Sequence, residues 1–225
     1  MKRAHRIFLA AVFILAGVIV AAGFFAAQTV SRGNTSPDGP VNTLIIPDVR
    51  QSESYSCGAA CTQAVFNYWG VDVREGTLMQ ELNTTGDAGT APDSIVNVAR
   101  AHGLTAYRAE NLTIDDLARA VDAKIPVIVD CQAWRDPNEV NESWESLWED
   151  GHYMIVIGVD SANVYFEDPS LQGTRGYIPR DEFESRWHDY PGESPYGKNS
   201  TAFYHLGIFI NGTVPASYPP FTHVD

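Results

Sequence analysis

The fold of this chain is decided by the stretch Gln51-Ser-Glu-Ser-Tyr-Ser-Cys57-Gly58-Ala-Ala-Cys61. The residues that follow, from Ala59 to Trp69, predict an amphipathic helix, which places the thiol of Cys57 at a helix N-terminus. The dipole and the free N–H groups of such a terminus favour a thiolate. Gln51 lies one short loop away, where a side-chain amide could help to bind an oxyanion.

Two later motifs supply the other groups that a nucleophilic cysteine needs. Gly151-His152-Tyr153 opens an apolar run, and Asp168-Pro169 closes the next one. We interpret Cys57 as the nucleophile, His152 as general base and acid, and Asp168 as the acid that orients the imidazole. Gln51 is then the oxyanion donor. Glu167 is the local competitor of Asp168, but strand alternation points it the other way.

Each of these residues also has a purely structural interpretation. Cys57 could be a buried thiol, His152 a packing residue, Asp168 a turn residue before proline, and Gln51 a polar loop residue. The motif context favours the functional interpretation in each case. Gly58 would let a substrate backbone approach closely.

The N-terminus indicates export of the body of the protein. Residues 1–6 carry positive charge, residues 7–30 read as a transmembrane anchor or signal sequence, and 31–44 as a linker to a domain over 45–225. The uncharged run from Ile7 to Ala27 is long enough to span a bilayer, which favours an anchor. Val20-Ala21-Ala22 would permit cleavage as a signal peptide instead.

Charge and sequons agree with an exported protein. The net charge is −13, and because residues 1–32 carry four positive charges and no acids, the remainder carries −17. So acidic a surface argues against nucleic acid as a partner, and it suits plain solubility or a basic substrate. Six Asn-x-Ser/Thr sequons suggest a glycoprotein. They are Asn34, Asn83, Asn111, Asn141, Asn199 and Asn211.

The two other cysteines leave two possibilities open. Cys61 and Cys131 form a disulfide in one, leaving Cys57 free, and are buried free thiols in the other, which we favour. No second Cys/His cluster has zinc-ligand spacing, so we expect neither metal nor cofactor.

Hydrophobic periodicity predicts an α+β fold with a helical half followed by a largely antiparallel sheet. Helices are expected over 59–69, 74–82, 90–102, 113–122 and 180–187, and strands over 42–49, 104–108, 126–131, 153–159, 163–167, 176–179 and 203–210. The acidic segment 136–150 is either a lid or substrate-binding arm, or a solvated amphipathic helix with its Trp side chains packed down.

The chain resembles the papain-like cysteine peptidases of the bacteriocin-processing, double-glycine-leader type, in a stand-alone branch without a transporter. The resemblance spans residues 45–190. The motifs that carry it are Gln51 to Cys61, Lys124-Ile-Pro-Val-Ile-Val, Gly151-His152-Tyr-Met-Ile-Val-Ile-Gly158, Phe166-Glu-Asp168-Pro169 and the helix from Phe183 to Trp187.

This resemblance implies a papain-like fold with Cys57, His152, Asp168 and Gln51 as catalytic residues. We therefore expect a membrane-anchored, externally facing cysteine peptidase that acts on a peptide or protein through a thioester acyl-enzyme. Acyl or amide transfer on the same site, and a non-catalytic papain-like binding module at the cell surface, remain as alternatives. The sequence does not fix the oligomeric state.

Overall fold

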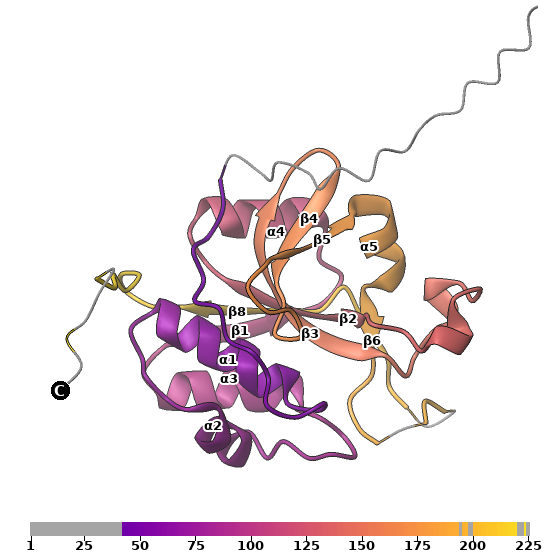
Figure 1. Cartoon of the computed structure of the whole chain (residues 1–225), viewed down its shortest axis with the longest axis horizontal. Helices are drawn as coiled ribbons and strands as arrows, with labels where there is room; N and C mark the ends of the chain where they lie inside the picture. Colours follow the sequence, from indigo (N-terminus) through magenta and orange to yellow (C-terminus); the bar gives the residue numbers. More distant parts are fainter. Residues whose placement is uncertain (1–41, 194, 198–199, 220–222, 224–225) are drawn as a thin grey trace, which may run out of the picture. The chain divides into compact units, whose positions relative to one another are not determined.

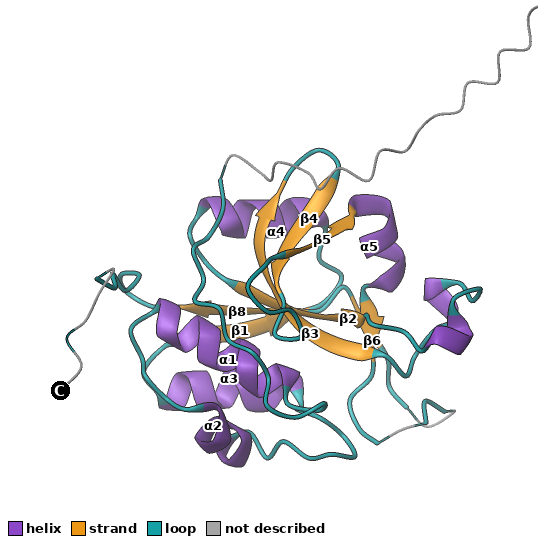
Figure 2. Cartoon of the chain, in the orientation of Figure 1, coloured by secondary structure: helices purple, strands orange, loops and turns teal. Residues whose placement is uncertain are grey.

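The computed structural model describes residues 42–193, 195–197, 200–219 and 223. The helices are α1 (Cys57–Tyr68), α2 (Glu75–Glu81), α3 (Pro92–Ala101), α4 (Ile114–Asp122) and α5 (Arg180–Arg186), with 3₁₀ turns η1 (Pro137–Glu139) and η2 (Trp144–Ser146). The strands are β1 (Thr105–Ala109), β2 (Val127–Gln132), β3 (Gly151–Val159), β4 (Asn163–Glu167), β5 (Gly176–Pro179), β6 (His188–Asp189), β7 (Phe203–Tyr204) and β8 (Gly207–Asn211) (Figures 1 and 2).

The N-terminal segments predicted as n-region, anchor and most of the linker lie outside the described residues. No helix within the described part of the chain is long and apolar enough to cross a membrane.

The sheet is antiparallel and confirms the predicted α+β class. Its strand order is β1-β8-β2-β3-β4-β5, and β6 and β7 form a separate two-stranded ribbon. Strand β2 is buried along its whole length because helices cover both faces of the sheet. Figure 1 shows α1 and α3 on one side of the sheet and α4 on the other, and both α1 and α4 pack against β3.

Helix α1 is held in the core on almost every side, which fixes the position of its N-terminus. Small residues, Gly58, Ala59 and Ala60, fill its first turn and allow close packing. The helix ends at Tyr68. Gly70 follows with a φ of +79°, which glycine adopts at little cost, and the N–H of Val71 bonds to Phe66 O.

The β3–β4 hairpin contains a β-bulge. Val156 pairs with Phe166, but the next pair is Gly158 with Tyr165, so Ile157 has no partner on β4. The carbonyl of Ile157 accepts the N–H of Leu44 at 2.8 Å. The bulge thus shifts the register of the hairpin by one residue and anchors the start of the domain.

Three predicted elements are wrong in detail. Residues 42–49 are extended but form no strand, because they join β3 mainly through the Leu44 bond. The predicted strand 203–210 is divided into β7 and β8, since His205 between them has φ +50°. The segment 136–150 forms the short turns η1 and η2 instead of an α-helix.

Both Trp side chains of segment 136–150 are packed down, as the non-lid interpretation expects. Trp144 lies between the guanidinium groups of Arg135 and Arg186, at 3.8 and 3.7 Å from its ring centroid. Trp148 stacks on Tyr196 with ring centroids 4.2 Å apart.

Candidate active site

Cys57 is the first residue of α1, so the predicted placement of its thiol at a helix N-terminus is observed. Burial alone would raise the pKa of this thiol. The hydrogen bond and charge of His152 oppose that effect, as do hydrogen bonds with the backbone of Tyr153 and Gly58, and together they hold the pKa of Cys57 below its ordinary value. The site therefore favours a thiolate.

His152 is held between the thiol and a carboxylate. It lies in β3 and is buried, and its Nε2 is 2.7 Å from Asp168 Oδ1. Burial would lower the pKa of His152, but the hydrogen bonds to Asp168 and Cys57 and their charges raise it to about 9. Since Nε2 faces Asp168, the other ring nitrogen, Nδ1, is left for the thiol.

Asp168 accepts hydrogen bonds on both carboxylate oxygens. Oδ1 accepts from His152 and from the backbone N–H of Ser170 at 2.8 Å, and Oδ2 accepts from Nε1 of Trp134 at 3.1 Å. Glu167 points elsewhere, as predicted: its carboxylate accepts the N–H of Val49 at 3.1 Å. Burial, set against that bond and the nearby Arg175, raises the pKa of Glu167 to about 7.

Gln51 lies at the Asp168 end of the site, but its amide is engaged away from Cys57. Its Nε2 donates to Glu53 O at 2.8 Å, and its Oε1 accepts from Ser170 Oγ at 3.1 Å. The backbone N–H of Gln51 also bonds to Pro169 O. The structure thus brings Cys57, His152 and Asp168 into contact and places Gln51 next to them without a direct contact to the thiol.

Gly58 was expected to let a substrate backbone approach, but it packs against the protein itself. A Cβ at this position would lie 2.7 Å from Cβ of Thr90 and 3.1 Å from the ring of Tyr153. The space beside Gly58 is therefore filled by the protein itself. Glycine is needed there for close packing of α1, not for the approach of a substrate.

All three cysteines are free, so the disulfide possibility is not realised and the alternative of buried thiols at Cys61 and Cys131 is confirmed. The Cys61 thiol donates to Tyr153 O at 3.2 Å. Burial raises the pKa of both thiols well above the ordinary value. Among the residues that the structure describes, no group of three or more His, Cys, Asp or Glu side chains could hold a metal ion.

Two features of the site were missed from sequence. Trp134 follows β2 with φ +59°, and no sequence pattern marks it as a partner of Asp168. Asp130 is the second. It lies in the middle of the buried strand β2 and lines a cavity beside Cys57. An acid inside an otherwise apolar run is a visible signal, and it could have been noticed.

The class of protein follows from this geometry together with comparisons to known proteins. The sequence profile of the Peptidase_C39 like family matches residues 43–195. The chain belongs to this family, and with it to the cysteine-type peptidases, which are hydrolases.

One sequence relative and two solved structures of similar fold are also found. An uncharacterized protein of Methanothermobacter marburgensis is 30% identical over 135 residues, which are 60% of this chain and 78% of that protein. The fold is similar to a double glycine motif protease from an AMS/PCAT transporter, solved in complex with the leader peptide. The TM-score is 0.54 and the identity 18%, over 78% of this chain and 97% of that one. The peptidase domain of Streptococcus ComA, a bifunctional ABC transporter involved in quorum sensing, gives a TM-score of 0.53 and 19% identity, over 73% and 97% of the two chains.

Proposed function

We propose that this protein is a membrane-anchored, extracytoplasmic cysteine peptidase that hydrolyses peptide bonds through Cys57, His152 and Asp168. The observation that carries the proposal is the position of His152, which is hydrogen-bonded to the Cys57 thiol and, through Nε2, to Asp168 at 2.7 Å. A thiol, an imidazole and a carboxylate joined in this order are the groups that acyl transfer requires.

The reaction has two halves. The Cys57 thiolate attacks the carbonyl carbon, the tetrahedral intermediate collapses, and the C–N bond breaks while the His152 imidazolium gives its proton to the leaving amine. The acyl group is then a thioester on Cys57. A water molecule attacks it with His152 as general base, releasing the carboxylic acid and restoring the thiolate–imidazolium pair.

Two donors are available for the oxyanion of the tetrahedral intermediate. The backbone N–H of Cys57 belongs to the first turn of α1, where N–H groups have no intrahelical partner. The side-chain amide of Gln51 has a second hydrogen besides the one donated to Glu53, and this hydrogen is free to be donated to an oxyanion once the side chain turns toward Cys57. We assign Gln51 this role with Cys57.

A peptide is the substrate class that the comparisons favour. The solved relative from the AMS/PCAT transporter holds a leader peptide. A peptide in extended conformation suits a site whose nucleophile lies at the edge of an open cavity.

The pH-dependence of Cys57 alkylation tests the proposal. An ordinary thiol with a pKa near 8.5 is only roughly 0.3% ionised at pH 6. Because the pKa of Cys57 is lowered by the adjacent His152, whose own pKa is raised to about 9, we expect Cys57 to be labelled at pH 6 faster than an ordinary thiol. Mass spectrometry of the labelled full chain should find the label on Cys57, with Cys61 and Cys131 as built-in unreactive thiols.

The control is His152→Ala, which removes the group that lowers the thiol pKa and leaves burial, which raises it. Labelling at pH 6 should collapse in this variant. Slow labelling of the wild type, unchanged by the substitution, would instead favour the non-catalytic binding module.

The membrane anchor is the second part of the proposal. The apolar run from Ile7 to Ala27, preceded by positive charge, supports an uncleaved anchor. Four of the six sequons, at Asn83, Asn111, Asn141 and Asn211, are exposed, as an extracytoplasmic glycoprotein requires. We expect the protein to pellet with membranes, with its N-terminus intact and its domain open to protease added outside. A soluble mature chain beginning at Gly23 would indicate a cleaved signal peptide.

A further inference from the structure

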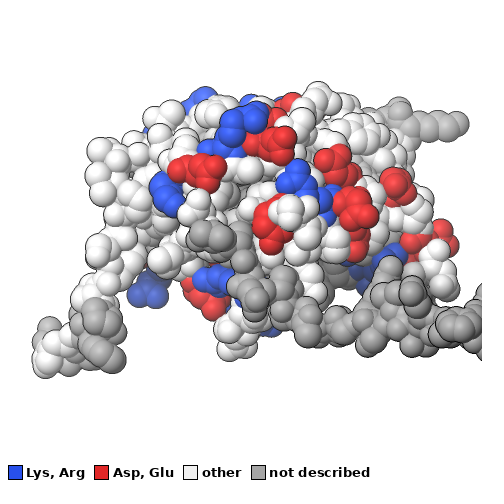
Figure 3. Space-filling model, turned by 90° about the horizontal axis from the view of Figure 1, so that it is seen from above, with Lys and Arg blue, Asp and Glu red and all other residues white. Residues whose placement is uncertain are grey.

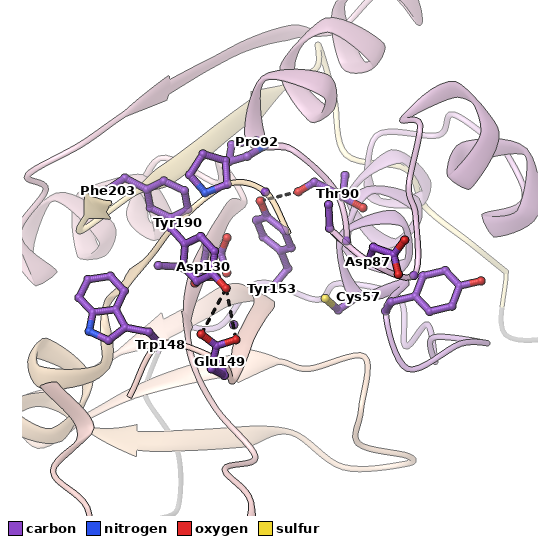
Figure 4. A pocket seen from close by; sticks show the side chains of 18 of the residues that line it. Cys57, Asp87, Thr90, Pro92, Asp130, Trp148, Glu149, Tyr153, Tyr190 and Phe203 are labelled. Atoms are coloured by element: carbon purple, nitrogen blue, oxygen red, sulfur yellow. Dashed lines mark hydrogen bonds between the residues drawn. The ribbon is translucent and has the colours of Figure 1, made fainter. Parts of the chain in front are cut away.

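A cavity of about 270 Å³ opens beside Cys57 and is lined by acids and aromatic rings (Figure 4). The acids are Asp87, Asp130, Glu149 and Asp189, and the rings are Tyr55, Trp148, Tyr153, Tyr190 and Phe203. None of the described residues that line it is Lys, Arg or His. The face seen in Figure 3 is different, because acidic and basic side chains are interspersed there. Among the described residues of the lining, no basic side chain offsets these acids.

Asp130, which lines this cavity, has one buried carboxyl oxygen without a hydrogen-bond partner. The residue is 4% exposed, and its Oδ1 has no hydrogen-bond partner. Tyr153 lies opposite Asp130 in the β2–β3 register, and its hydroxyl is hydrogen-bonded to Thr90 O, at 3.0 Å, and to the Asp130 side chain. A buried polar atom without a partner is destabilising, and more so when it is charged. Oδ1 of Asp130 thus stays unsatisfied, although the side chain also hydrogen-bonds Asp189 and Tyr153.

The side chain of Asp189 is held beside Asp130 by a hydrogen bond from Gln132 and by close packing on Gly151. Its Oδ1 accepts from Nε2 of the buried Gln132 at 3.2 Å, and Gln132 is itself held by His188 O at 3.1 Å and by the N–H of Asp150 at 3.0 Å. Its Oδ2 lies over Gly151, where any Cβ would approach to 2.1 Å. Only glycine at position 151 leaves room for the carboxylate in this position.

The two carboxyls are close enough to affect each other. Burial, and then the charge of Asp189, raise the pKa of Asp130 well above its usual range. Burial also raises the pKa of Asp189, to about 6. A cation placed between them would lower the cost of keeping both ionised.

We propose that this cavity binds the cationic side chain of a Lys or Arg residue that lies within two positions of the scissile peptide bond. The inference rests on the proposed function, since Cys57 forms part of the cavity wall and fixes the distance from the reacting carbonyl. Asp130 and Asp189 accept the N–H groups of the cation, and the aromatic rings pack along its stem and face. The cavity is smaller than the roughly 300–1,000 Å³ of drug-sized ligand sites, and it fits one long side chain.

Matched peptides that differ in one charge test the proposal. Arg and its neutral isostere citrulline are placed in turn at each of the two positions before and two after the cleaved bond. At one position we expect kcat/KM for Arg to exceed that for citrulline by about 10- to 100-fold, as for hydrogen bonds to a charged group. Asp130→Asn and Asp189→Asn should reduce this ratio toward one. Asp122→Asn, at the exposed last residue of α4, removes the same charge elsewhere and should leave the ratio unchanged.

Direct binding separates failure of this inference from failure of the proposed function. The full chain carrying Cys57→Ala is titrated calorimetrically with the same peptides. Tighter binding of the Arg peptide, lost in the Asp130→Asn and Asp189→Asn backgrounds, supports the cation site whether or not the wild type turns over. Equal binding of the Arg and citrulline peptides, or a preference that survives both Asn substitutions, overturns it even if Cys57 proves to be a reactive thiolate.

Discussion

Replacing Cys57 by alanine is expected to lower kcat/KM by on the order of 10⁶-fold, the scale seen when the nucleophile of a catalytic triad is removed. No other described thiol can substitute for it, because burial raises the pKa of Cys61 and Cys131 well above the ordinary value. The measurement is digestion of a peptide library by purified wild type and variant, read by mass spectrometry.

Cys61→Ala is the matched control for this experiment. It makes the same substitution one turn further along α1, where the thiol only donates to Tyr153 O. It should keep most of the activity. The double variant Cys57→Ala, His152→Ala should be no less active than Cys57→Ala alone, because residues that act as a unit are not additive. Activity retained by Cys57→Ala would eliminate the nucleophile assignment.

Asp168→Asn is expected to reduce kcat/KM by up to about 10⁴-fold, the effect of the equivalent change in a Ser-His-Asp triad. Both oxygens of Asp168 accept N–H donors, so an amide NH₂ must face one of them. The less costly orientation keeps the amide oxygen toward His152 and Ser170 and turns the NH₂ against Trp134. The hydrogen bond to His152 then survives, but the negative charge is lost.

The pH profile shows this loss of charge directly. Asp168 contributes to raising the pKa of His152 to about 9, so in the variant the imidazolium should lose its proton at lower pH. The alkaline limb of kcat/KM should therefore move below pH 9, and Cys57 labelling at pH 6 should slow. Glu167→Gln is the neighbouring control. Because that carboxyl bonds Val49 and not His152, the profile should stay in place. If Glu167→Gln shifts the profile and Asp168→Asn does not, Glu167 and not Asp168 orients His152.

Local signals predicted the elements that present the catalytic groups. The helix after Cys57 and the β3–β4 hairpin follow from apolar periodicity, and the capping box of Thr113 and Asp116 marks the start of α4. Each of these signals is contained in a short stretch of sequence. Chain order then placed the Cys, His and acid residues in one site.

The remaining features depend on contacts between distant segments. Trp134 reaches Asp168 because of its left-handed backbone conformation, and the pairing of Asp130 with Asp189 depends on where β6 lies against β2. The amide oxygen of Gln51 is held by Ser170, 119 residues away, while only its nitrogen has a local partner, Glu53 O. No local pattern encodes such contacts, so sequence reasoning could not provide them.

The bulge at Ile157 decides which of two neighbouring acids, Glu167 or Asp168, lies on the same face of the sheet as His152. With the bulge, Glu167 lies opposite Ile155, so Asp168, one residue on, belongs to the face shared by Met154 and His152. Without it, the pairing that starts at Val159 and Val164 would place Glu167 opposite Val156, on the His152 face, and turn Asp168 away. An insertion or deletion of one residue in β3, five positions from His152, would therefore exchange the two carboxylates. The number of residues in β3 between His152 and the turn to β4 therefore determines which carboxylate reaches the imidazole.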